Sequence, residues 1–130
     1  MLLTISINTR DRSEMIDITS RVEEQLSRSG LKDGVCFLFV PHTTAGITIN
    51  EHADPSVEVD IQAMFNKLVP WEGPYRHLEG NSAAHIKSSL IGNSVIVFVE
   101  SGHLKLGTWQ GIFFCEFDGP RSRKVHIRFQ

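Results

Sequence analysis

Histidines beside short polar residues are the part of this 130-residue sequence best suited to chemistry. Five of the six histidines, at positions 42, 52, 77, 85 and 103, fall in expected turns, loops or helix starts and not within apolar strands. Imidazole titrates near neutral pH and is the commonest metal ligand, so these side chains suit acid–base catalysis or metal binding. Each histidine taken alone can equally be a solvated surface residue, so its neighbours must distinguish the two cases.

The first candidate block follows an apolar run and covers residues 41–51. Thr43 and Thr44 supply hydroxyls beside a glycine, so side-chain donors and backbone amides here can converge on an anion. His42, Glu51 and His85 are the candidate catalytic residues, because an imidazole can act as an acid or base and a carboxylate can serve as a general base or as a metal ligand. The alternative is that the two threonines only hydrogen-bond the turn.

The second candidate block covers residues 77–85 and includes an expected helix start near Asn81. The free amides of a helix start bind anions, which makes Asn81 a candidate substrate-binding residue. His85 follows about one turn later, and His77 in the preceding loop can converge with it. Two imidazoles with Asn81 can hold a divalent metal, although a spacing of eight residues is not a recognised metal signature.

Two later turns complete the set of candidate residues. His103 lies between two apolar runs and is a candidate metal ligand with His77 and His85, although a histidine in a tight hairpin is often only a turn residue. Gln110 and Arg121 are candidate substrate-binding residues, since arginine can bind a phosphate through two parallel hydrogen bonds. Exposed arginines, however, usually bind nothing.

The elements that must position these blocks follow from hydrophobic periodicity. Strands are expected near residues 3–7, 35–40, 47–49, 94–99, 104–117 and 124–129, with a bulge or bend at Gly107 or Gly111 in the longest run. The continuous apolar run 35–40 indicates a strand buried on both faces, with 47–49 as its neighbour in the sheet.

Three helices are expected between these strands. The first lies within 17–31, with Ser20 and Glu23 as a capping box. Asp54-Pro55 begins the second, whose residues Ile61, Met64, Phe65 and Leu68 recur on one face and should be buried. The third runs from 81 or 82 to about 90. Strands outnumber helices, so we expect one α+β domain over residues 1–130, with an antiparallel or mixed, sandwich-like sheet packed with two or three helices.

Composition excludes several classes of function. The net charge of −2 gives no basic field for nucleic acid or an anionic membrane surface. No run of about 18 apolar residues exists, so no membrane-spanning helix is expected. The start of the chain lacks the features of a signal peptide, which makes a cytoplasmic location the default expectation. Cys36 and Cys115 lie in apolar runs, and two buried thiols are favoured over a disulfide between them.

Taken together, three polar blocks closely resemble the YjbQ-like family, often labelled secondary thiamine-phosphate synthase. The blocks read HTTAGITINE at 42–51, HLEGNSAAHIKSSLIG at 77–92 and GTWQGIFFCEFDGPR at 107–121. They occur in the family's order, and the resemblance extends over nearly the whole chain.

The resemblance implies a compact, sheet-rich α+β domain that assembles as a homotrimer. It also implies a weak or side activity that joins hydroxymethylpyrimidine diphosphate to a thiazole phosphate, a phosphorylated small-molecule substrate, and releases pyrophosphate. The resemblance also implies that histidines gather near subunit boundaries, where a divalent ion can bind. The residues to which this role is carried over are His42, His77, His85 and His103. Magnesium prefers oxygen ligands, whereas these histidines favour zinc.

Three functions therefore remain open at this point. The first is a transferase of the thiamine-phosphate synthase type. The second is a metal-dependent hydrolase, and the third is a non-catalytic trimeric binding module. The two enzymatic functions depend on whether the polar blocks meet in one hollow, either within a subunit or across two.

Overall fold

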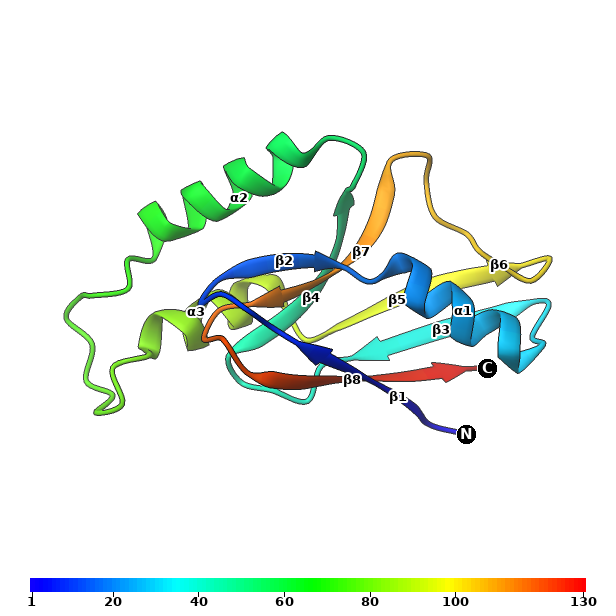
Figure 1. Cartoon of the computed structure of the whole chain (residues 1–130), viewed down its shortest axis with the longest axis horizontal. Helices are drawn as coiled ribbons and strands as arrows, with labels where there is room; N and C mark the ends of the chain where they lie inside the picture. Colours follow the sequence, from blue (N-terminus) through cyan, green and yellow to red (C-terminus); the bar gives the residue numbers. More distant parts are fainter.

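Two antiparallel sheets form the body of the chain in a computed structural model that describes residues 1–130 (Figure 1). The five-stranded sheet contains, in spatial order, β1 (Leu3–Asn8), β8 (Ser122–Phe129), β3 (Gly34–Phe39), β5 (Ser94–Glu100) and β6 (His103–Leu104). The three-stranded sheet contains β2 (Glu14–Asp17), β7 (Gln110–Glu116) and β4 (Ala45–Glu51). The helices are α1 (Thr19–Ser29), α2 (Pro55–Leu68) and α3 (Ser82–Ile91). This is the α+β, sandwich-like class that the sequence predicts.

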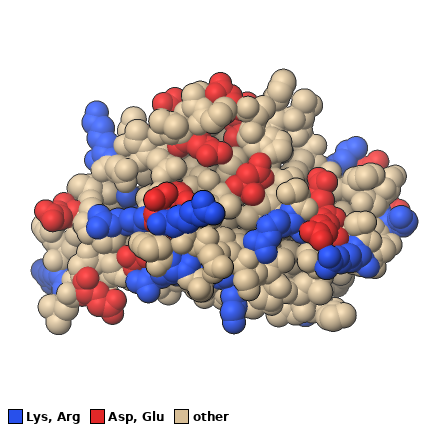
Figure 2. Space-filling model, in the orientation of Figure 1, with Lys and Arg blue, Asp and Glu red and all other residues tan.

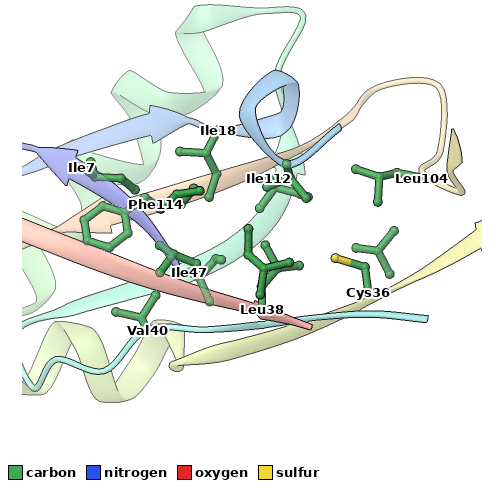
Figure 3. Packing of buried hydrophobic residues seen from close by; sticks show 14 of the residues in the cluster. Ile7, Ile18, Cys36, Leu38, Val40, Ile47, Leu104, Ile112 and Phe114 are labelled. Carbon is green, nitrogen blue, oxygen red and sulfur yellow. The ribbon is translucent and has the colours of Figure 1, made fainter. Parts of the chain in front are cut away.

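The main hydrophobic core lies between the two sheets. In Figure 3, Leu38 of β3 and Ile47 of β4 are among the side chains that fill this space, and each is only 1% exposed. Val22 and Leu26 of α1 belong to the same cluster, which explains their spacing of four residues. Cys36 is part of this core and Cys115 lies in a smaller one; both are free, buried thiols, as expected.

Strand β7 is buried on both faces and separates the two hydrophobic clusters. Phe114 faces the main core, whereas Phe113 and Cys115 face a second cluster that includes Ala84 of α3. This double burial explains why residues 112–115 read as an uninterrupted apolar run. The expected break in the long run 104–117 is also present, because β6 ends at Leu104 and β7 begins at Gln110.

The expected burial and pairing of 35–40 and 47–49 are wrong. Strand β3 alternates, with Leu38 buried but Phe37 and Phe39 exposed at 40% and 45%. It pairs with β5 and β8, while β4 pairs with β7 in the other sheet. Aromatic residues on the outer face of β3 produce an apolar run without a second buried face, so the run alone cannot distinguish the two arrangements.

The residues that end α1 and start α2 are those expected from the sequence. Asp54 caps α2 by accepting a hydrogen bond from the Ser56 amide at 2.9 Å, and Gly30 ends α1 in the left-handed region. The expected capping box at Ser20 is absent. The Asp17 carboxylate instead accepts from the Thr19 amide and hydroxyl, and α1 starts at Thr19, two residues earlier than a Ser20 cap would place it.

Helix α2 buries none of its residues, contrary to expectation. It stands apart from the sheets in Figure 1, and Val59, Met64 and Leu68 are 65%, 51% and 66% exposed. Ile61, Met64 and Phe65 nevertheless line a groove beneath the helix, together with Met15 and Ile91. The apolar periodicity therefore specifies a helix whose apolar face has too few partners within one chain.

The surface charges are mixed in sign. Figure 2 shows basic and acidic side chains interspersed over one face, with no extended basic field. No helix of the structure has both the length and the apolar character that a membrane crossing requires.

Candidate functional site

A polar cleft lies between the β3–β4 loop and helix α3. Its volume is about 610 Å³. Its walls carry two imidazoles and several hydroxyl and amide groups: His42, Thr43, Ala45, His85, Ser88, Ser89, Gly92 and Asn93. Two candidate blocks that are far apart in the sequence, 41–51 and 77–85, therefore meet here.

Close contact between β4 and the end of α3 fixes the shape of the cleft. The Ser88 hydroxyl donates to the Thr43 carbonyl at 2.5 Å, and the Ile47 amide donates to the Gly92 carbonyl at 3.0 Å. A Cβ atom on Gly46 would lie 2.6 Å from that Gly92 oxygen, so only glycine permits this approach. Gly46, which the sequence analysis placed in a candidate anion-binding turn, thus allows the end of α3 to pack directly against β4.

His42 is held by the neighbouring strand. The Lys124 amide of β8 donates to His42 Nε2 at 2.9 Å. A nitrogen that accepts a hydrogen bond must keep its lone pair, so in the neutral ring Nδ1 carries the proton. Burial and then the charge of Arg123 lower the pKa of His42, partly offset by Glu116. His42 is therefore arranged as a neutral donor to the cleft through Nδ1.

The lowered pKa of His42 predicts that stability falls in mild acid. Below the ordinary value of 6.5, the unfolded chain binds this proton more readily than the folded chain does. Stability from this residue is therefore complete above that pH and is lost as the pH falls toward the folded-state pKa. Urea midpoints between pH 7.5 and 5 should fall more steeply for the wild type than for His42→Gln, and parallel pH profiles would contradict this.

His85 faces two hollows at once. It lines the polar cleft and also a smaller hollow of about 350 Å³ with Tyr75, Arg76, His77, Ser82 and Ile86. The rings of His77 and His85 meet edge to face with centroids 5.4 Å apart. No protein group hydrogen-bonds the ring nitrogens of His85, so they remain available to a ligand. Convergence of His77 with His85, expected from the sequence, is thus present.

The residues of one chain do not form a metal site by themselves. Structural and catalytic zinc sites use three or four protein ligands. His77 and His85 supply two imidazoles, and no group of three or more His, Cys, Asp or Glu side chains lies close enough together to hold an ion. His103, the third expected ligand, is in β6 and pairs with Glu100 of β5 at the edge of the large sheet, far from α3 in Figure 1.

A buried ion pair lies behind the cleft. Glu116 is completely buried and accepts from Arg123 Nε at 2.8 Å and from the Thr9 hydroxyl at 2.7 Å. Arg123 also donates to the Thr44 hydroxyl at 2.8 Å. Thr44 was expected to bind substrate, but it is 6% exposed and holds the β3–β4 loop to this ion pair.

Asn81 and Arg121 are also engaged within the chain. Both donate to Asp118 Oδ2, at 2.9 Å from Asn81 and 3.0 Å from Arg121. Arg121 Nε donates in addition to the Asp118 carbonyl at 2.7 Å. The buried Asn81 Oδ1 has no partner, and the Asn81 side chain does not cap α3. These contacts order the loop after β7 and compete with the substrate-binding roles expected for both residues.

Glu51 and Gln110 lie at the far end of β4 from the cleft. They pair with each other across the β4–β7 ladder, whereas Ala45 at the cleft pairs with Glu116. Glu51 follows Ala45 by six positions of extended strand, which is about 20 Å. Glu51, at the end of the first block, and Gln110, near the start of the third, thus do not reach the cleft within one chain, and a shared site between copies stays a prediction.

One polar pair was missed by reasoning from sequence. His52 Nδ1 lies 2.9 Å from Asp17 Oδ2, and both side chains are partly exposed. Hydrogen bonds from Thr19 and His52 lower the pKa of Asp17 although burial opposes them. The polar run 50–52 could have flagged His52, but nothing local in the sequence indicates a partner 35 residues away.

Comparison with known proteins assigns the chain to one family throughout its length. The sequence model described as "UPF0047 protein YjbQ-like" matches residues 3–130. The chain is 56% identical to the UPF0047 protein YugU of Bacillus subtilis, with 98% of each chain covered. It is 38% identical to the UPF0047 protein YjbQ of Salmonella typhimurium, covering 92% of this chain and 91% of that protein.

Solved structures share the same fold. A YjbQ/UPF0047 protein of Clostridium acetobutylicum superposes with a TM-score of 0.96 at 52% identity, covering 98% of this chain and 99% of that one. The conserved hypothetical protein TT1486 of Thermus thermophilus gives a TM-score of 0.92 at 44% identity, with 98% and 99% covered. None of these names states an activity, so the function has to be argued from the site.

Proposed function

The chain belongs to the UPF0047 YjbQ-like family, and from that premise we propose that it is a small transferase acting on phosphorylated heterocycles at the His42–His85 cleft. The observation that carries the proposal is the meeting of His42 and His85 in one polar cleft of about 610 Å³. The reaction that we propose joins hydroxymethylpyrimidine diphosphate to a thiazole phosphate.

In this reaction a ring nitrogen of the thiazole attacks the methylene carbon of the pyrimidine diphosphate. The new C–N bond forms as the C–O bond to the diphosphate breaks, and its electron pair leaves with pyrophosphate. Negative charge therefore grows on the leaving oxygens, and positioned donors there stabilise the transition state more than the ground state. The cleft must supply such donors and hold two phosphorylated groups.

The cleft residues support these roles. Neutral His42 offers Nδ1–H to a leaving oxygen, because Lys124 already occupies Nε2. His85 has free ring nitrogens and can donate or accept a proton. Thr43, Ser89 and Asn93 line the cleft and can orient phosphate oxygens. Thr44, Asn81 and Arg121 have partners within the chain, so their donors are engaged before substrate arrives.

The direct test is incubation of purified protein with both phosphorylated halves and Mg²⁺. We expect thiamine phosphate and pyrophosphate in equal amounts, detected by chromatography. Imidazole NMR signals should locate the site, because those of His42 and His85 should shift when the pyrimidine diphosphate is added. Product formation with no shift at either histidine would place the reaction elsewhere. Absence of product and of any shift would remove this transferase from consideration.

A metal-dependent hydrolase is the second candidate, favoured by the close approach of His77 and His85. Their rings provide two ligands, and any further ligand has to come from another copy of the chain or from substrate. Elemental analysis of protein purified without a histidine tag tests this candidate. Stoichiometric zinc that is lost in His77→Gln would favour it, and metal-free protein with full synthase activity would eliminate it.

We propose in addition that the working unit is a homotrimer. Two sets of exposed apolar side chains support an assembly of copies: Val59, Met64 and Leu68 of α2, and Phe37, Phe39, Ile96 and Phe98 on the outer face of β3 and β5. Patches of this kind on a small domain usually mark interaction sites. Light scattering should give three times the chain mass, and a concentration-independent monomer would contradict the proposal.

A further inference from the structure

A further hollow lies on the other side of α3 from the histidine cleft. Its volume is about 320 Å³. Two of its six lining residues are cationic and none is acidic. The six are Arg12, Ser13, Asn66, Trp71, Lys87 and Phe117. A hollow with this composition presents positive charge and neutral hydrogen-bonding groups, with two aromatic rings as walls.

Lys87 is the unusual member of this hollow. It is only 4% exposed, although lysine is almost never buried without an anionic partner. Its ammonium carries three donors, and the only protein acceptor that it reaches is Asn66 Oδ1 at 2.7 Å. Burial and then the charge of Arg12 lower the pKa of Lys87. The protein thus holds an incompletely satisfied ammonium at the base of the hollow.

Arg12 places a second positive charge at the exposed rim. Its guanidinium carbon lies 4.2 Å from the centre of the Trp71 ring, which fixes the group by a cation–π contact. The Arg12 side chain donates to no protein acceptor, and neither Arg12 nor Lys87 takes part in any of the six ion pairs of the structure. Two cations near each other without a carboxylate repel, and a bound anion would reverse that penalty.

We propose that this hollow, with Lys87 at its base and Arg12 at its rim, is a binding site for the phosphate or diphosphate group of a small molecule. A tetrahedral oxyanion accepts from an ammonium and a guanidinium together, and both contacts are charge-assisted and short. The Ser13 hydroxyl and the Asn66 amide border the same space and can donate to the remaining oxygens. The volume admits a diphosphate but not a polymer.

This site is separate from the proposed reaction cleft, and it does not depend on the proposed reaction. Lys87 follows His85 by two residues, which turns its side chain about 200° around the axis of α3. His85 accordingly lines the cleft against β4, while Lys87 points toward α2 and Trp71. One helix thus presents an imidazole to one hollow and an ammonium to another.

The test uses Trp71 as a local reporter and inorganic pyrophosphate as the probe. In Trp109→Phe protein Trp71 is the only indole, because the chain has two tryptophans. Pyrophosphate should change its fluorescence saturably. Arg12→Gln and Lys87→Met should each weaken the apparent affinity by roughly ten- to a hundredfold, because each removes one charged donor. Arg12 is exposed, so its replacement tests the site even if Lys87→Met does not fold.

Lys32→Met is the matched control, because it removes one exposed lysine charge beside the Gly102 turn, away from this hollow. Lys32→Met should leave the midpoint of the pyrophosphate titration unchanged, and His85→Gln should do the same. Equal weakening by Lys32→Met would show general charge attraction only. Loss of the signal in His85→Gln, or no saturable response at millimolar pyrophosphate, would overturn the proposal.

Discussion

Replacing Arg123 with methionine is expected to lower the free energy of unfolding by about 3–5 kcal/mol. Arg123 is 5% exposed and its partner Glu116 is completely buried. Methionine keeps much of the volume but leaves the Glu116 carboxylate without its counter-ion, and a buried unpaired charge is among the most destabilising defects. Thr44 would lose its donor as well. Urea denaturation monitored by far-UV circular dichroism measures the change.

Lys105→Met provides the control for this effect. Its ion pair with Glu100 has side chains that are 64% and 60% exposed, so we expect a change below about 1 kcal/mol. Adding Glu116→Gln to Arg123→Met should restore part of the lost stability, because a neutral amide then replaces the unpaired carboxylate. If Arg123→Met and Lys105→Met were equally mild, the buried ion pair would not be the support of the β3–β4 loop.

The second large effect concerns turnover at the cleft and rests on the proposed transferase. His85→Gln should reduce kcat by about 10²–10⁴-fold, the usual range for loss of a general acid or base. His42→Gln should reduce it less, because the glutamine amide can still donate a hydrogen bond in place of Nδ1–H. Steady-state measurement of pyrophosphate release gives both values, and circular dichroism confirms that the variants are folded.

His103→Gln tests whether a loss of kcat is specific to the histidines of the cleft. His103 lies in β6 and does not reach the cleft within one chain. We expect wild-type kcat for this variant if the site is complete in one subunit. A loss as large as that of His85→Gln would mean that a neighbouring copy brings His103 to the site. Full activity in His85→Gln would move the chemistry away from this cleft.

Much of the local structure could be predicted from the sequence because its causes are local. Asp54-Pro55 starts α2 through a cap formed within two residues, and Gly30 ends α1 through its own backbone conformation. Alternation likewise predicts that Val125 and Ile127 face the core, where both are fully buried. The convergence of His77 and His85 also follows from a short loop and one helical turn.

The sequence could not tell which polar groups would be free. Thr44, Asn81 and Arg121 are typical substrate-binding residue types, yet Thr44 is held by Arg123, 79 residues away, and Asn81 by Asp118, 37 residues away. A donor that already has a partner offers little to a ligand, and such partners are set by long-range contacts. Long-range contacts of the same kind hold Lys87, whose ammonium donates to Asn66 of α2 and is buried in a cationic hollow.

By itself, then, the sequence determined the α+β class, the start of α2, the end of α1 and the set of chemically capable residues, since periodicity and capping act over a few residues. The tertiary structure decided that β3 and β4 belong to different sheets, and that His42 meets His85 while Glu51 and Gln110 lie at the other end of β4. The reason is physical: strand pairing and sheet packing join distant segments, and no local pattern encodes which segments those are.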